Sequence, residues 1–226
     1  MNNTIIFYGH LPKKGEVPVG GGEVGNSRTL RMLSMAGYNL KVVRMPKPSL
    51  KWGAKLIHAM YPLRVLFVLI KFFCTLLFSS RKSIVHISGF AGINIWSEIA
   101  LLYISKSLGY FTIYEQRAGG AIMFYKTGSN IYKKCYRYVI GHADYIFTQG
   151  LENIPMMRLM TGKTIYHYPN CVEDSFAPSK LPDKPNCQIN LLYFGRVEKE
   201  KHVDLVISVA HRIQKKNPKD LFDYYW

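Results

Sequence analysis

The fold class of this chain is decided by Ser83-Ile-Val-His-Ile-Ser88, by the segment from Ile93 to Leu108, and by Phe111-Thr-Ile-Tyr-Glu115. The two short runs are rich in β-branched and aromatic residues, which is typical of buried strands. The segment between them carries apolar residues at helical spacing. A strand, a helix and a second strand in this order predict two parallel strands joined by a crossover helix.

The same alternation recurs on both sides of this stretch. Further strands are predicted at 4–8, 40–44, 145–148, 164–168 and 190–194, and further helices near 25–36, 50–78, 130–141, 152–160 and 203–215. Alternation this regular predicts an α/β fold with a Rossmann-like, doubly wound parallel sheet.

The domain boundaries follow from composition. Residues 171–188 contain Pro178, Pro182 and Pro185 with little apolar content, which is typical of a linker. Residues 1–170 are therefore expected to form an N-terminal domain and 189–226 the incomplete start of a second Rossmann-like domain. One strand and one helix cannot cover both faces of a parallel sheet, so we expect a chain cut short within that domain.

Composition and charge narrow the function classes. The chain of 226 residues has 30 Lys and Arg against 14 Asp and Glu, a formal net charge of +16. Its 48% apolar content excludes collagen-like and disordered proteins, and the charge predicts an anionic partner. The four cysteines are isolated and no signal peptide precedes them, which predicts a reduced cytoplasmic setting. His and Cys form no closely spaced ligand pairs, so a metal site is not predicted.

The apolar segment from Tyr61 to Phe78 is close to the length that spans a bilayer. Arg64 and Lys71 interrupt it, and they share one side of a helix because they are seven residues apart. This pattern favours a helix in an anionic membrane interface. A long core helix with two snorkelling cations is the alternative.

A glycine-rich stretch precedes the first predicted helix. Gly20, Gly22 and Gly25 match the spacing GxGxxG, and such bare backbone can approach a phosphate at a helix N-terminus. The long segment from Gly9 to Val19 and the strand end at Arg44 argue against a dinucleotide site, which needs a tight turn and an acidic residue there. We therefore expect a loop that faces a phosphate or sugar, with a plain flexible loop as the alternative.

The second predicted domain opens with a strand that ends at Gly195. Arg196 follows directly and Lys201 five residues later, just ahead of a helix. Ligands of open α/β sheets bind at the carboxyl ends of strands. A guanidinium fork and an ammonium together suit the several oxygens of a diphosphate.

Three motifs together resemble glycosyltransferase family 4, of the GT-B fold: Gly20-Gly21-Gly22-Glu23, the turn Pro169-Asn170-x-Val172, and Gly195-Arg196-x-x-x-x-Lys201. The resemblance covers nearly the whole chain. It implies an N-terminal domain that binds the acceptor, a C-terminal domain that binds a nucleotide-sugar donor, and transfer with retention of configuration and without a bound metal or other cofactor.

Carried over by position, the resemblance implies that Arg196 and Lys201 hold the donor diphosphate and that Gly21 and Gly22 approach it from across the cleft. The chain departs from the family where a His usually ends the fourth strand, because the sequence here is Glu115-Gln116-Arg117. Glu115 is expected to contact substrate hydroxyls, and Arg117 an anionic group or the charge that develops in the cleft. The Glu-x7-Glu signature of the donor domain is absent.

Other residues after predicted strands are expected to line the acceptor side of the cleft, namely His10, Gly20, Gly119 and Gly120. His10 could equally be a structural hydrogen-bond donor. A helical stripe of Tyr125, Tyr132, Tyr136 and Tyr138 indicates core packing more than stacking against sugars.

The sequence thus predicts a truncated glycosyltransferase of bacterial surface polysaccharide biosynthesis, whether of O-antigen, capsule or lipopolysaccharide. Its expected partners are a nucleotide-sugar, a lipid-linked saccharide acceptor and the acidic inner face of the cytoplasmic membrane, where it would be peripheral. The alternative is a non-catalytic remnant or module that binds membrane or lipid-linked glycan. Nucleic acid is not expected, because the cations are scattered without a recognised motif.

Overall fold

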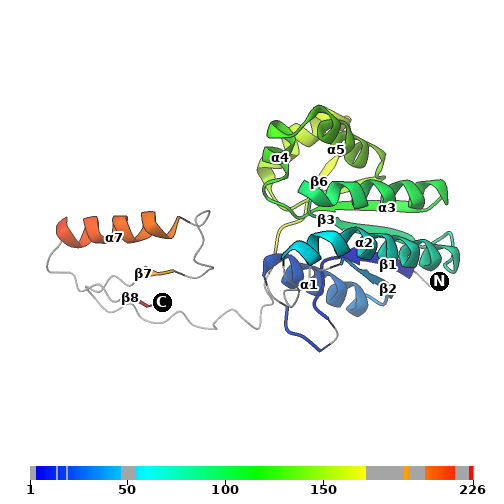
Figure 1. The fold of residues 1–226 in the computed structure, drawn as a ribbon, viewed down its shortest axis with the longest axis horizontal. Helices are drawn as coiled ribbons and strands as arrows, with labels where there is room; N and C mark the ends of the chain where they lie inside the picture. Colours follow the sequence, from blue (N-terminus) through cyan, green and yellow to red (C-terminus); the bar gives the residue numbers. More distant parts are fainter. Residues whose placement is uncertain are drawn as a thin grey trace. The chain divides into compact units, whose positions relative to one another are not determined.

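The computed structural model describes residues 4–13, 15–18, 20–46, 54–171, 191–193, 202–216 and 224–225. The chain separates into two compact units, 1–171 and 172–226 (Figure 1).

The first unit is built on a six-stranded parallel sheet in the order β2-β1-β3-β4-β5-β6. The strands are β1 (Thr4–Gly9), β2 (Asn39–Arg44), β3 (Ile84–Gly89), β4 (Phe111–Gln116), β5 (Tyr145–Thr148) and β6 (Ile165–His167). β1 pairs with β2 on one side and with β3 on the other. This arrangement confirms the predicted Rossmann-like α/β fold.

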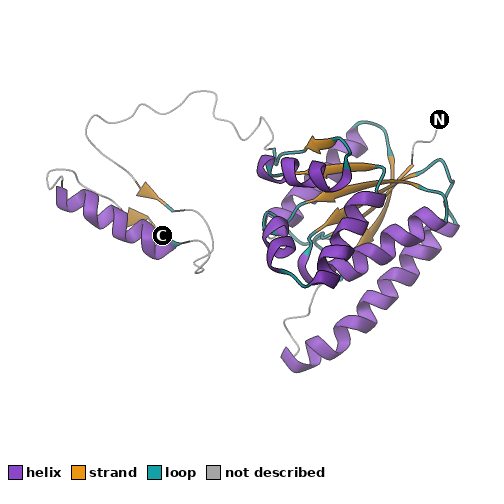
Figure 2. Ribbon diagram, turned by 90° about the horizontal axis from the view of Figure 1, so that it is seen from above, coloured by secondary structure: helices purple, strands orange, loops and turns teal. Residues whose placement is uncertain are grey.

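Helices flank the sheet (Figure 2). They are α1 (Gly21–Met35), α2 (Ala54–Leu77), α3 (Ile95–Ser107), α4 (Ala121–Thr127), α5 (Asn130–His142) and α6 (Ile154–Thr161), with short 3₁₀ turns η1 (Gly92–Asn94) and η2 (Leu151–Asn153). The helix pairs α2–α3, α3–α5 and α5–α6 are in contact. Helix α1 is expected on the face of the sheet opposite to these helices. Crossovers between parallel strands are right-handed, and the chain moves across the sheet in one direction from β1 to β2 and in the other direction from β2 to β3.

The core lies between the sheet and the row α2–α6. Its fully buried side chains come from alternating strand positions and from the inner faces of the helices, and include Tyr8, Val85, Ile87, Tyr114, Leu101, Leu102, Val139 and Ile140. β1 and β3 are buried at five consecutive positions each. Both faces of these central strands are therefore covered, as parallel sheets require.

The start of α1 differs from the prediction. The helix was expected to begin near Gly25, but it begins at Gly21, so Gly21, Gly22 and Gly25 lie inside it. Gly20 allows this earlier start because its φ of 81° lies in the left-handed region that favours glycine. Helix α4 was also not predicted, since glycines at 119, 120 and 128 bracket its seven residues and resemble loop sequence.

Within the second unit, β7 (Leu191–Leu192) pairs in parallel with β8 (Tyr224–Tyr225), and α7 (Val203–Lys216) follows β7 in the chain. Val203 and Ala210 are the buried side chains of α7. Strand β8 was not predicted from the sequence.

Candidate functional site

The carboxyl edge of the first sheet holds the candidate site. The chain leaves β1 toward β2 on one side, and β3 lies on the other side of β1, so the strand order reverses between β1 and β3. Open α/β sheets bind ligands in the crevice at such a switch point. Here the residues that follow β1 and β3 meet the N-terminal turns of α1.

The three glycines at the start of α1 have different surroundings. A Cβ on Gly21 would have no heavy atom within 4 Å, so this backbone borders open space. A Cβ on Gly22 would lie 2.7 Å from the ring of Phe90, in the segment that follows β3. A Cβ on Gly25 would overlap the guanidinium of Arg117. Gly22 and Gly25 are thus required by packing, whereas packing does not require Gly21.

Asn26 fastens α1 to the ends of two strands. Its Nδ2 donates to the carbonyl of His10, just after β1, at 2.9 Å, and its Oδ1 accepts from Ser88 Oγ of β3 at 2.8 Å. Asn26 and Ser88 are both completely buried. A buried amide with partners on both sides fixes the position of the first two turns of α1.

Arg117 fastens α1 to β4 and to the segment after β6. Its Nη2 lies 2.8 Å from Glu115 Oε1 and donates to Thr29 Oγ1 of α1 at 2.8 Å. Its Nη1 donates to Asn170 Oδ1 at 3.4 Å. Thr29 Oγ1 also lies 3.1 Å from the hydroxyl of Tyr168. The guanidinium is buried, so this ion pair and these hydrogen bonds replace part of its hydration, whereas the buried Nε has no hydrogen-bond partner.

Glu115 is an internal anion of this cluster. It has no exposed surface, and its second oxygen lies 3.0 Å from Nε2 of the buried His86 on β3. A substrate could reach the Glu115 carboxylate only by displacing its neighbours. The expected contact with substrate hydroxyls is therefore not available in this arrangement, and Glu115 instead balances the charge of Arg117.

His10 follows β1 at the carboxyl edge of the sheet. Its Nε2 is 3.7 Å from Glu23 Oε1, and its ring meets that of Phe90 edge-on with centroids 5.7 Å apart. About a third of the His10 side chain is exposed, at 33%, whereas that of Glu23 is buried at 3%. Phe90 thus contacts both His10 and Gly22, next to the open backbone of Gly21.

The segment between β3 and α3 depends on Glu98, a residue that sequence reasoning missed. Its Oε1 accepts from the backbone N–H groups of Phe90 and Ala91 at 2.7 and 3.2 Å, and its Oε2 accepts from Tyr114 Oη at 2.7 Å. Ala91 has a positive φ of 53°, which is unfavourable for a residue with a Cβ. Glu98 therefore stabilises the backbone that holds Phe90 against Gly22.

Burial raises the pKa of Glu98 above its ordinary value, and the three hydrogen bonds offset part of this effect. Burial likewise raises the pKa of Tyr114, with the nearby Glu98 carboxylate as a further cause. The only sequence signal for Glu98 is an isolated acidic residue in the first turn of an apolar helix.

The structure describes some of the remaining predicted residues and not others. Gly119 and Gly120 follow β4 at the carboxyl edge, where Gly120 is the N-cap of α4 and a Cβ on Gly119 would meet open space. Arg196, Lys201 and Gly195 lie outside the described residues. The tyrosine stripe belongs to the core at Tyr136, which is fully buried, and at Tyr125. The part of the chain that the structure describes has no cluster of three metal-ligating side chains.

Comparisons with known proteins give no identification. No family model matches the chain. A search of the curated proteins also finds no match.

Proposed function

We propose that the first unit is the acceptor-binding half of a retaining glycosyltransferase that resembles family 4. The observation that carries the proposal is the position of Gly21, whose bare backbone borders open space at the switch point of a parallel sheet. A helix N-terminus there favours an anion, because its free N–H groups and its dipole attract negative charge. A sugar nucleotide offers such an anion as its diphosphate.

The chemistry of glycosyl transfer suits these groups. The leaving nucleoside diphosphate gains negative charge as the bond to the anomeric carbon breaks, so donors and cations aimed at it stabilise the transition state. We propose that the first turn of α1, with Gly21 and Gly22, faces the diphosphate; the prediction that Arg196 and Lys201 also bind a diphosphate concerns residues outside the described part of the chain. The proposal requires no metal and no cofactor besides the donor substrate.

The acceptor side would be formed by His10, Gly20, Gly119 and Gly120. Glu115 and Arg117 would act as positioning residues, because their contacts hold α1 rather than reach open space. A lipid-linked saccharide of bacterial surface polysaccharide synthesis, at the inner face of the cytoplasmic membrane, is the acceptor that matches the basic charge of the chain.

Replacing Gly21 by alanine tests this proposal. The added methyl group meets nothing in the protein, and alanine favours helix more than glycine does, so the stability is expected to stay the same or increase. The methyl group would occupy the space proposed for the diphosphate, so donor affinity should fall about tenfold or more. The measurement is calorimetric titration with a panel of UDP- and GDP-sugars, together with release of nucleoside diphosphate.

Gly141→Ala provides the matched control. Gly141 lies in α5, and a Cβ there also meets nothing within 4 Å. This variant should bind donors like the unmodified chain. Equal donor binding by Gly21→Ala and the unmodified chain, or no binding of any sugar nucleotide by the unmodified chain, would contradict the proposed function.

A further inference from the structure

Helix α2 has two apolar faces, and the structure covers only one of them. Phe72 and Leu76 are fully buried in the core. The opposite face exposes large apolar side chains over four turns, between 39% and 83% of each: Leu63, Leu66, Phe67, Ile70, Phe73, Leu77 and, just past the helix, Phe78. The predicted alternative of a core helix is therefore wrong, because only 11% of the apolar window Met60–Leu77 is buried.

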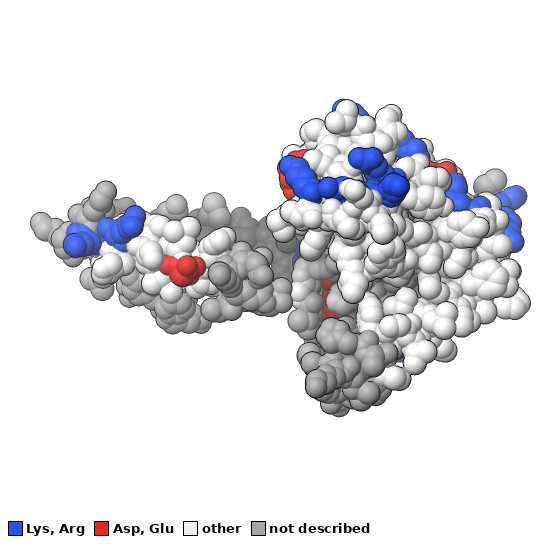
Figure 3. Space-filling model, turned by 45° about the horizontal axis from the view of Figure 1, so that its top comes forward, with Lys and Arg blue, Asp and Glu red and all other residues white. Residues whose placement is uncertain are grey.

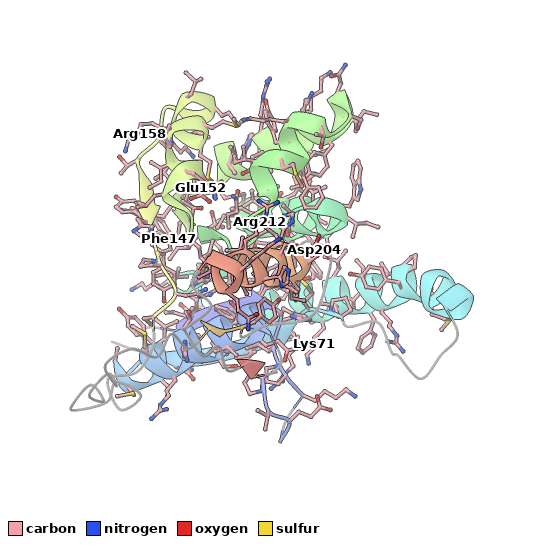
Figure 4. All side chains as sticks on the ribbon, turned by 90° about the vertical axis from the view of Figure 1, so that its left-hand side faces the viewer. Lys71, Phe147, Glu152, Arg158, Asp204 and Arg212 are labelled. Atoms are coloured by element: carbon pink, nitrogen blue, oxygen red, sulfur yellow. The ribbon has the colours of Figure 1, made fainter. Side chains whose placement is uncertain are left out.

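The exposed positions form one stripe. Leu63, Ile70 and Leu77 are spaced by seven residues and define its centre, and the other positions lie beside them at helical spacing. In Figure 4, side chains project from the cyan helix α2 away from the rest of the unit. We call the seven exposed side chains the outer face of α2. An apolar surface of this extent indicates a binding surface.

Helix α2 is long and apolar enough to cross a bilayer by length and composition. However, it connects β2 to β3, which belong to the same parallel sheet. A crossover helix must return alongside the sheet, and Phe72 and Leu76 pack into the core as this geometry requires. In this fold, α2 can therefore lie in a membrane interface but cannot span the membrane.

The charges around the outer face indicate which surface it binds. The sequence contains no Asp or Glu between Glu23 and Glu98, whereas Lys and Arg recur throughout that stretch. Arg64 and Lys71 flank the stripe on one side, since they share a helical direction next to it. On the face drawn in Figure 3, a broad area is uncharged, Lys and Arg gather in patches, and Asp and Glu are few.

We infer that the outer face of α2 is a docking surface for a bilayer with anionic headgroups, with its apolar side chains at the acyl boundary and Arg64 and Lys71 at the phosphates. A second copy of the chain fits less well. A twofold contact would bring a surface with cations and no acidic residue against itself.

The inner face of α2, opposite the docking surface, contacts the segment after β3. Tyr61 of α2 donates a hydrogen bond to Asn94 Oδ1 of η1 at 3.3 Å, next to the segment that carries Phe90. Ile93 and Trp96, on either side of Asn94, are also exposed. The docking surface itself does not depend on the proposed glycosyl transfer.

Vesicle co-sedimentation of the full chain tests this inference. Vesicles of pure phosphatidylcholine are compared with vesicles of equal parts phosphatidylcholine and phosphatidylglycerol. The unmodified chain is expected to bind the anionic vesicles and to bind them less as salt rises. The double variant Phe67→Asp/Ile70→Asp should bind them at least about tenfold more weakly, because it puts charge where apolar area is to be buried. Arg64→Gln/Lys71→Gln should lose about fivefold per cation and most of the preference for anionic vesicles.

Leu159→Asp is the matched control, because Leu159 on α6 is 88% exposed and lies outside the docking surface. It should bind vesicles like the unmodified chain, and circular dichroism should show the same helix content for all variants. The inference is overturned if the unmodified chain binds neither vesicle or binds both equally, or if Leu159→Asp loses as much binding. A dimer in light scattering that Phe67→Asp/Ile70→Asp converts to a monomer would also overturn it. Gly21→Ala should bind vesicles like the unmodified chain. A failure of the proposed function and a failure of this inference can therefore be distinguished.

Discussion

Replacing Arg117 by methionine is expected to lower the free energy of unfolding by about 3–5 kcal/mol. The substitution keeps most of the side-chain volume but leaves the carboxylate of Glu115 buried without its cation, 3.0 Å from His86. It also removes the hydrogen bond to Thr29 that fastens α1. Urea denaturation followed by circular dichroism measures the loss.

The double variant Glu115→Gln/Arg117→Met separates charge from packing. Removing both charges is expected to recover a large part of the lost stability, because breaking a buried pair costs more than replacing both partners. An equal loss in the single and double variants would show that the hydrogen bonds to α1, and not the buried charge, determine the effect. A loss below about 1 kcal/mol in the single variant would contradict the buried ion pair.

Glu98→Ala is expected to destabilise the first unit by about 3 kcal/mol or more. The change leaves the N–H groups of Phe90 and Ala91 and the hydroxyl of Tyr114 without their acceptor, and each unmade buried hydrogen bond costs about 1–3 kcal/mol. Ala91 would also lose the contact that holds its unfavourable φ. Urea denaturation and amide hydrogen exchange at residues 89–93 measure the global and the local effect.

Glu98→Gln is the conservative partner of this variant and has an expected pH dependence. The raised pKa of Glu98 means that the folded state retains a proton that the unfolded state has lost. The free energy of unfolding therefore decreases as the pH rises from the ordinary pKa of 4.5 to the raised one, and this contribution is constant above it. Glu98→Gln lacks the titration, so its stability relative to the unmodified chain should increase across that window. The same pH slope in both proteins would contradict a buried carboxylate with a raised pKa.

The strands of the first unit were predictable because each is short, apolar and bounded by polar or glycine-rich sequence. The predicted strand at residues 145–148 matches β5, and the other five in the first unit differ from the structure by one residue at one or both ends. Helix starts were less predictable. The prediction for α1 was wrong by four residues, because glycine is expected to interrupt a helix and here initiates one.

The sequence could predict which residues lie at the carboxyl edge of the sheet, but not the contacts that they make there. Residues that follow parallel strands must meet at one edge, and this placed His10, Glu115, Arg117 and Gly119 together. The spacing could not show that Glu115 turns inward toward His86. It also could not show that Glu98, from the middle of an apolar stretch, holds the backbone of Phe90 and Ala91.

The sequence by itself determined the alternation of strands and helices, the parallel sheet and the excess of positive charge. These properties depend on local composition and period, which are written along the chain. Only the tertiary structure decided which glycine borders open space, which carboxylates are buried and which face of α2 is left uncovered. Each of these depends on contacts between segments that are far apart in sequence, such as Arg117 with Thr29 and Asn26 with Ser88, and local sequence carries no signal for such contacts.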